Sequence, residues 1–226
     1  MHTIARFCNA LLALIVACAG MLGLQSVQAG TMPAMDAGEA MPHEEHAHHH
    51  VIAPYSRSTV NYSVPDVTLV RADGRQVQLS DELSDSRAVV LSFIYTSCTT
   101  VCPLTSATLS ALQDKLGNAI DRVHLVSISI DPEYDTPARL REYAQRFGAG
   151  PEWQYYTGTL AASQRSQRAF DVYRGNKMDH APVTLVRPQP GSAWVRIDGF
   201  ATAEQLMNEL ALPASNSAGG QSHAQR

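Results

Sequence analysis

The chain has 226 residues, 45% of them hydrophobic, and a formal net charge of -4 at pH 7. This length suits one ordinary domain with extensions, and the hydrophobic fraction is enough to build a core. The acidic balance and the lack of a basic run argue against a nucleic-acid-binding protein.

Residues 1–29 have the pattern of a secretory signal peptide. Arg6 precedes an apolar run at residues 10–24, and residues 27–29 match a small-x-small cleavage site. The apolar run is short for a membrane span, which needs about 20 apolar residues. Two alternatives stay open: a lipoprotein cleaved before Cys18, which follows a lipobox-like sequence, and an uncleaved membrane anchor. We expect cleavage after residue 29 and export to the periplasm.

Residues 30–60 are interpreted as a tether, because their first two thirds are rich in histidine, methionine and small residues and show no apolar periodicity. Imidazole and thioether groups suit copper, so this segment is expected to collect the metal weakly. An inert linker is the alternative. The side chains expected to form these auxiliary sites are Met32, Met35, Met41, His43, His46, His48, His49 and His50.

The folded domain is expected at residues 61–213, and a disordered tail is expected after it, at residues 214–226. Near the start of the domain, apolar runs at 67–70 and 77–79 flank an Asp-Gly pair, which is a strong signal for a β-hairpin. The domain is therefore predicted to begin with a hairpin extension.

The most informative stretch begins with residues 89–95, an apolar run rich in β-branched and aromatic residues that predicts a buried strand. Cys98 and Cys102 follow it, and after Pro103 the leucines recur at helical spacing. The remaining predicted elements are a turn or short helix at 80–83, strands at 123–130, 153–156, 182–186 and 193–197, and helices at 137–147, 160–173 and 202–210.

This order of elements predicts an α/β domain. A helix joins strands 89–95 and 123–130, so the two strands should be parallel. Their carboxyl ends then share one edge of the sheet, and that edge carries Cys98 and Asp131. Ligand sites in open α/β sheets lie at such edges.

After cleavage of the signal peptide, Cys98 and Cys102 are the remaining cysteines. A structural disulfide between them would close a loop of three residues and would constrain the unfolded chain little. A helix N-terminus favours thiolate over thiol, and thiolates are both redox nucleophiles and ligands for soft metals. The pair is therefore predicted either to chelate one metal ion or to form a redox-active disulfide.

Three motifs in order resemble the Sco/SenC family of exported copper-binding proteins, which have a thioredoxin fold and serve cytochrome c oxidase assembly. They are Cys-x-x-x-Cys-Pro at 98–103, Asp-Pro-x-x-Asp-Thr-Pro at 131–137, and Asp-His at 179–180. The resemblance spans roughly residues 65–212. It implies a thioredoxin-like fold with an N-terminal β-hairpin extension and a late β-hairpin.

The resemblance also implies a ligand set. Cys98, Cys102 and His180 would hold copper as Cu(I) or Cu(II), since thiolates suit Cu(I) and the imidazole would also accept Cu(II). Asp131 either orients a ligand from the second coordination sphere or serves as a turn residue. Zinc competes for such donors, but a closed zinc site needs four ligands, and His124 is the one other histidine of the folded domain.

These observations favour a periplasmic copper metallochaperone rather than an enzyme, one that delivers copper to the CuA-bearing subunit of cytochrome c oxidase or to another copper protein. The alternative is a thiol–disulfide oxidoreductase that uses Cys98 and Cys102 to keep the oxidase copper-site cysteines reduced. A peroxidase fits worse, because Tyr95 stands where the peroxiredoxin motif has proline. Membrane association would require the uncleaved or lipidated N-terminus.

Overall fold

The computed structural model describes residues 55–210 and residue 212, so the predicted signal peptide, the metal-collecting part of the tether and the predicted tail lie outside the described residues. No helix of the described part is long and apolar enough to cross a membrane. The described strands are β1 Ser56–Val60, β2 Thr68–Arg71, β3 Gln76–Gln78, β4 Ala88–Ile94, β5 Val123–Ser129, β6 Trp153–Gly158, β7 Val183–Arg187 and β8 Trp194–Asp198. The described helices are α1 Leu79–Glu82, α2 Val101–Leu116, α3 Pro137–Arg146, α4 Leu160–Ala169 and α5 Ala203–Leu210, with 3-10 turns η1 Gly117–Arg122 and η2 Lys177–Asp179.

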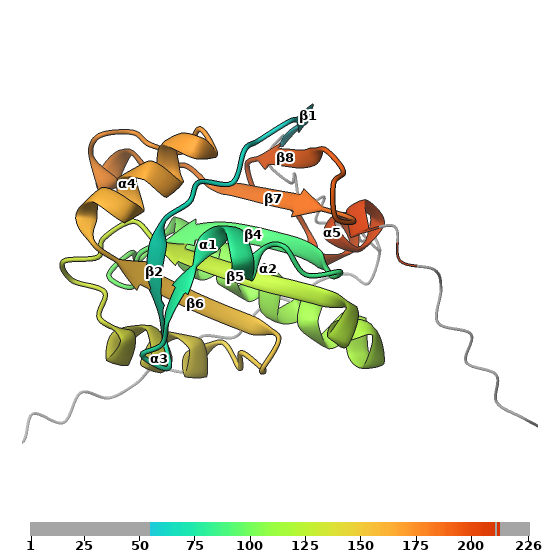
Figure 1. Cartoon of the computed structure of the whole chain (residues 1–226). Helices are drawn as coiled ribbons and strands as arrows, with labels where there is room; N and C mark the ends of the chain where they lie inside the picture. Colours follow the sequence, from blue (N-terminus) through green and yellow to red (C-terminus); the bar gives the residue numbers. More distant parts are fainter. Residues whose placement is uncertain (1–54, 211, 213–226) are drawn as a thin grey trace, which may run out of the picture. The chain divides into compact units, whose positions relative to one another are not determined.

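The described strands form one mixed sheet in the order β1-β8-β7-β4-β5-β6-β2-β3 (Figure 1). β4, β5 and β6 run parallel to one another, and β7 is antiparallel to β4. Every residue of β4 and β5 is buried. A central parallel strand is covered on both faces, and this explains why the sequences of β4 and β5 are almost continuously apolar.

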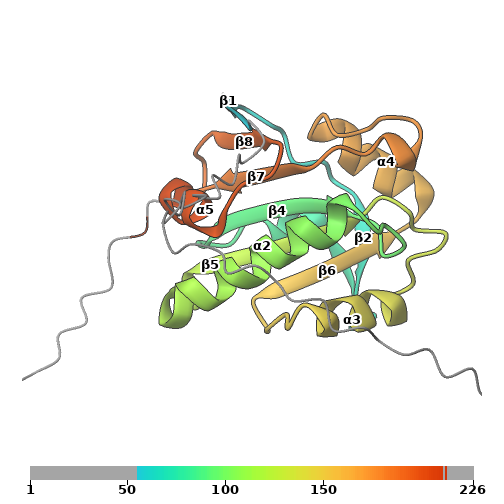
Figure 2. The same cartoon turned by 180° about the vertical axis from the view of Figure 1, so that it is seen from behind.

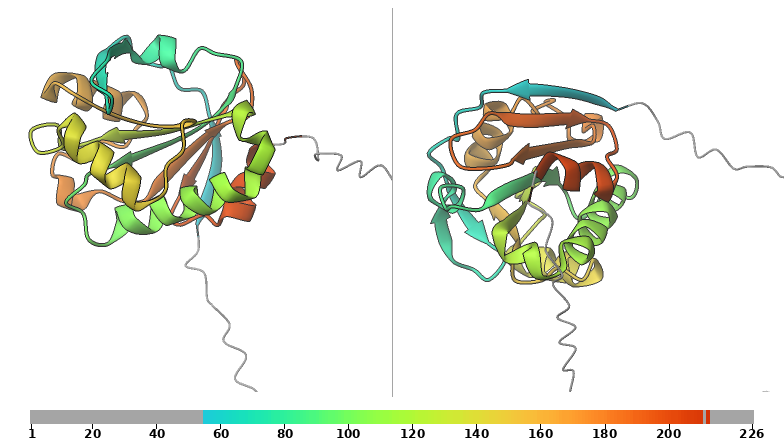
Figure 3. Two further views of the ribbon diagram at one scale, coloured as in Figure 1. Left: turned by 90° about the horizontal axis from the view of Figure 1, so that it is seen from below. Right: turned by 90° about the vertical axis from the view of Figure 1, so that its right-hand side faces the viewer.

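The helices cover both faces of the sheet. Figure 2 shows α2 in front of β4 and β5 with α5 beside it, and α1 and α4 lie on the opposite face of the sheet (Figure 3). The core lies between these layers and the central strands. The chain leaves β4 at the carboxyl edge of the sheet, turns, and enters α2, which places both cysteines at that edge.

Local sequence signals set several boundaries. The β2–β3 hairpin turns through Gly74, whose φ of 93° favours glycine. α3 begins after Thr136, whose hydroxyl accepts the Arg139 N–H at 3.3 Å, with a proline in its first turn. Before α5, Gln205 Oε1 accepts the Thr202 N–H at 2.7 Å and Thr202 Oγ1 accepts the Gln205 N–H at 3.2 Å, which is a capping box.

The structure corrects two predicted boundaries. Strand β1 lies within residues 56–60, which were assigned to the tether; it is largely exposed and polar, so it carries no apolar alternation, and it is held by pairing with β8. α4 ends at Ala169 rather than at residue 173. Asp171 adopts a φ of 53°, and the Val172 N–H donates to the Gln167 carbonyl at 2.8 Å, which closes the helix.

The packing of α2 generates a matched test of the core. Leu109 is 0% exposed and Leu104, on the same helix, is 56% exposed. Leu109→Ala should lower the free energy of unfolding by about 2–5 kcal/mol, because it leaves a cavity. Leu104→Ala should change it by less than about 0.5 kcal/mol. Chemical denaturation of both variants measures the difference, and equal losses would contradict this packing of α2.

Candidate functional site

The two cysteines meet at the N-terminus of α2. Cys98 lies in the loop after β4 and Cys102 is the second residue of the helix. Both are free thiols with little exposure, 7% for Cys98 and 1% for Cys102. The Cys102 N–H donates to Cys98 Sγ at 3.4 Å, while the N-cap residue Thr100 makes no side-chain cap. The sulfur of Cys98 thus accepts a helix N–H that would otherwise lack a partner.

The two thiols differ in acidity. Burial alone would raise the pKa of the Cys98 thiol, but the backbone N–H groups of Cys102 and Thr100 donate to its sulfur and bring the pKa down to about 7. Burial raises the pKa of the Cys102 thiol. At neutral pH the pair therefore combines one partly ionised thiolate with one protonated thiol.

A buried carboxylate that the sequence analysis did not single out holds the loop before Cys98. Asp135 is fully buried, and its carboxylate accepts the Thr96 N–H at 3.2 Å, the Thr96 hydroxyl at 2.5 Å and the Ser129 hydroxyl at 2.6 Å. Burial raises the pKa of Asp135. The available signal was its position as the second aspartate of the Asp-Pro-x-x-Asp-Thr-Pro motif.

Asp131 follows β5, and its carboxylate pairs with the Lys177 ammonium at 2.5 Å. Lys177 belongs to η2, on the segment that leads to His180. Asp131 therefore contacts the segment that carries the histidine. Its predicted role in orienting a ligand stays a prediction, because its carboxylate pairs with Lys177 and not with the side chain of a predicted ligand.

His180 lies directly after η2, with its Nε2 at 2.9 Å from the Phe93 carbonyl oxygen of β4. A carbonyl accepts, so Nε2 carries the hydrogen and Nδ1 keeps its lone pair. Burial lowers the pKa of His180 and favours the neutral ring. The ring meets the Tyr95 ring edge to face, with 6.4 Å between the centroids.

The three predicted ligands lie on neighbouring segments without converging on one point. Within residues 55–210, no three His, Cys, Asp or Glu side chains are grouped closely enough to hold a metal ion. Cys98 and Cys102 are in contact, whereas His180 is held against the Phe93 carbonyl. A shared ion would require the imidazole to approach the two sulfurs.

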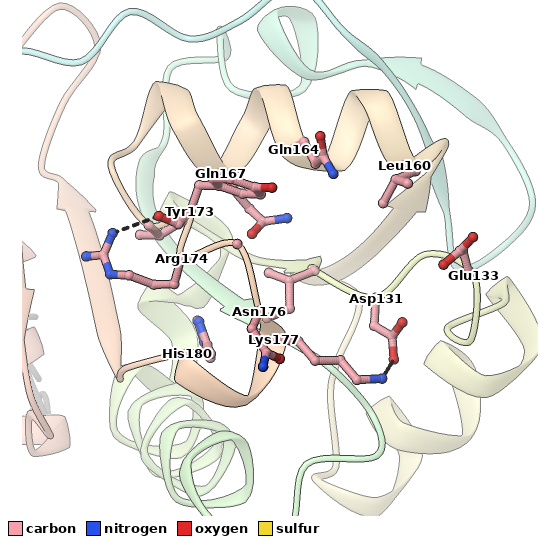
Figure 4. Close-up of a pocket in the computed structure, with 13 residues that line it drawn as sticks. Asp131, Glu133, Leu160, Gln164, Gln167, Tyr173, Arg174, Asn176, Lys177 and His180 are labelled. Atoms are coloured by element: carbon pink, nitrogen blue, oxygen red, sulfur yellow. Dashed lines mark hydrogen bonds and ion pairs between the residues drawn. The ribbon is translucent and has the colours of Figure 1, made fainter.

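A cavity of about 360 Å³ opens beside His180, between α4 and the segment leading to η2 (Figure 4). Gln164 of α4 and Arg174 contribute to its lining, and Lys177 reaches across it toward Asp131. His180 therefore has open space on one side, which leaves room for its ring to change position.

His124 is not part of this site. It pairs in register with Val89 near the beginning of β4, whereas Cys98 follows the end of that strand. Its Nε2 lies 3.4 Å from the Tyr156 hydroxyl, and burial lowers its pKa to about 4. A zinc site that combines His124 with the two cysteines is therefore excluded.

The solved structures that share this fold include those of two Sco proteins. Arabidopsis thaliana ScoI, solved with copper bound, is 26% identical with a TM-score of 0.55, over 65% of this chain and 94% of that one. BsSco, described as a member of the Sco family of cytochrome c oxidase assembly proteins with a disulfide switch, is 23% identical with a TM-score of 0.57, over 67% of this chain and 93% of that one. The predicted thioredoxin-like fold, with its two hairpins, is confirmed.

Sequence relatives agree with the structural ones. The SCO1 protein homolog of Bacillus subtilis is 33% identical over 103 residues, which are 45% of this chain and 52% of that protein. The chain thus spans about half the length of this relative. The SCO1/SenC family model matches residues 58–211, more than half of the sequence, and this protein therefore belongs to the SCO1/SenC family.

Proposed function

We propose that this protein is a periplasmic copper metallochaperone, which binds copper through Cys98, Cys102 and His180 and delivers it to the CuA centre of cytochrome c oxidase. The observation that carries the proposal is the contact of the two thiols at the N-terminus of α2, where the Cys102 N–H donates to Cys98 Sγ at 3.4 Å. Family membership and the copper-bound structure of a relative support it.

The donor chemistry fits copper. Two thiolates suit Cu(I), a soft ion, and the helix N-terminus stabilises their negative charge. The neutral imidazole of His180, once released from the Phe93 carbonyl, supplies the nitrogen that Cu(II) prefers. Copper is cargo here, so a site in which one ligand approaches from a separate segment suits both binding and release.

The residues before the folded domain supply the remaining parts of the proposal. Cleavage after residue 29 would release the protein into the periplasm, and the histidines and methionines at 32–50 would collect copper weakly near the folded domain. The acceptor would be the CuA-bearing subunit of the oxidase or another copper protein. A lipid on Cys18 or an uncleaved apolar segment would instead hold the chaperone at the membrane.

A second candidate, thiol–disulfide oxidoreductase, is favoured by the difference in thiol acidity. The Cys98 thiolate would attack a client disulfide and form a mixed disulfide. Cys102 would then lose its proton and attack Cys98 Sγ, leaving a Cys98–Cys102 disulfide and a reduced client dithiol. The two electrons come from the dithiol of this chain, so the step balances without a further cofactor.

The acidity difference predicts the pH dependence of alkylation. The rate at Cys98 should rise as the pH increases through about 7, where the thiol ionises, and level off above it. Cys102 should react slowly throughout, because burial raises its pKa. Iodoacetamide labelling followed by peptide mass spectrometry assigns each rate. A Cys98 midpoint near the ordinary thiol pKa of 9.0 would show that the helix N–H groups do not stabilise its thiolate.

The ligand assignment predicts distinct losses of copper binding. Cys98→Ser or Cys102→Ser should abolish tight Cu(I) binding, because a single thiolate is not a chelate. His180→Ala should keep much of the Cu(I) affinity and lose most of the Cu(II) binding. Competition titrations and Cu(II) absorption spectra measure both, and an unchanged Cu(II) affinity and spectrum in His180→Ala would remove His180 from the ligand set.

The same variants separate the two functions in cells. A chaperone needs the imidazole, so His180→Ala cells should lose oxidase activity about as fully as Cys98→Ser cells, with partial rescue by added copper. A reductase needs an attacking thiolate and a resolving thiol, both of which survive in His180→Ala. Normal oxidase activity in that variant, together with rescue of Cys98→Ser by an added thiol reductant, would favour the reductase.

A further inference from the structure

Met178 is a large apolar side chain that lies next to Tyr95, three residues before Cys98 in the loop after β4. It lies in η2, two residues before His180, and is 71% exposed. Exposure alone is ordinary for a single apolar residue. The sulfur, however, makes a directed contact, because the Tyr95 hydroxyl donates to Met178 Sδ at 3.9 Å.

Tyr95 brings the soft donors of the site together around one side chain. Its hydroxyl faces the Cys98 thiol as well as the Met178 thioether. Its ring meets the His180 ring edge to face at 6.4 Å. Tyr95 therefore connects Met178 with Cys98 and His180, and Met178 is the most exposed of these three residues.

We propose that Met178 is the entrance ligand of the site, a thioether that meets incoming Cu(I) and passes it inward to Cys98 and Cys102. This inference rests on the proposed function. Thioethers are soft donors that suit Cu(I). A single neutral thioether holds the ion more weakly than two thiolates do, so the ion moves inward as Cu–thiolate bonds replace the Cu–thioether bond. No electron is transferred in this exchange.

The charges around Met178 permit the approach of a cation. Lys177 precedes it, but its ammonium is paired with the Asp131 carboxylate at 2.5 Å. The same ammonium lies 5.6 Å from the centroid of the Tyr95 ring. Asp179 follows Met178 and is exposed. The segment therefore presents a carboxylate beside a neutralised ammonium, which does not repel Cu(I).

Met207 provides the contrast and the control. It lies on α5, partly buried against the core, as expected of a methionine that fills space. Replacing either methionine with leucine removes the sulfur and keeps a similar volume. The exposed Met178→Leu variant should fold as the wild type does.

The first test is the rate of Cu(I) transfer from a coloured Cu(I) chelator to the full chain. Met178→Leu should slow the transfer by about tenfold, the smaller of the losses seen when a group outside the main ligand set of a metal site is removed. The final copper load should not change, and Met207→Leu should keep the wild-type rate. An unchanged rate in Met178→Leu would overturn the inference while leaving the chaperone function intact.

The second test detects the thioether directly. In protein labelled with ¹³C at the methionine methyl groups, the Met178 resonance, assigned by its loss in Met178→Leu, should shift as Cu(I) is added. The shift should persist in the Cys98→Ser/Cys102→Ser double variant, where copper on the cysteines cannot move Tyr95. A fixed resonance there would overturn the inference. Absence of Cu(I) binding by the wild type would instead overturn the proposed function, and the inference with it.

Discussion

The position of Cys98 depends on the buried carboxylate of Asp135. A charge removed from water is costly unless hydrogen bonds satisfy it, and here donors from Thr96 and Ser129 do so. These donors come from the chain just after β4 and from the end of β5, so the carboxylate ties the two strand ends together. The Ile130 N–H adds to this connection by donating to the Ile94 carbonyl at 2.8 Å. The turn that presents Cys98 is fixed as a consequence.

The segment that carries His180 is held differently. Its polar contacts with the central layer include the Lys177–Asp131 ion pair, whose lysine is 40% exposed, and the hydrogen bond from the His180 ring to the Phe93 carbonyl, and Tyr95 adds weak contacts with Met178 and with the His180 ring. An exposed ion pair contributes about 0–1 kcal/mol, and a single hydrogen bond contributes about as much. Moving the imidazole therefore costs far less than moving the cysteines. This difference gives the proposed chaperone a fixed pair of thiols and a histidine that can be displaced.

Sequence patterns predicted the elements whose signals are local. The continuous apolar runs of β4 and β5 identified these strands because each signal lies within its own element. β1 was not predicted, because its stability comes from pairing with β8, far along the chain. The end of α4 depends on the left-handed conformation of Asp171, a residue type that tolerates this conformation without requiring it.

The candidate site was likewise predictable only where its signals are local. The cysteine pair at a strand-to-helix junction was visible from periodicity and spacing, whereas His180 entered only through the family resemblance. Its distance from the cysteines depends on the path of residues 171–179, which no local pattern specifies. Asp135 and Met178 were missed for a related reason. Each acquires its importance from partners on other segments, Thr96 and Ser129 for the carboxylate and Tyr95 for the thioether.

The central claim is that copper is held by thiolates of the Cys98–Cys102 pair together with the His180 imidazole. X-ray absorption at the copper edge tests it most directly, on the full chain loaded with one equivalent of Cu(II). The account predicts scattering from two sulfur atoms and an imidazole nitrogen, with the sulfur contribution lost in the Cys98→Ser/Cys102→Ser double variant. A spectrum of nitrogen and oxygen ligands alone, the same in both proteins, would contradict it.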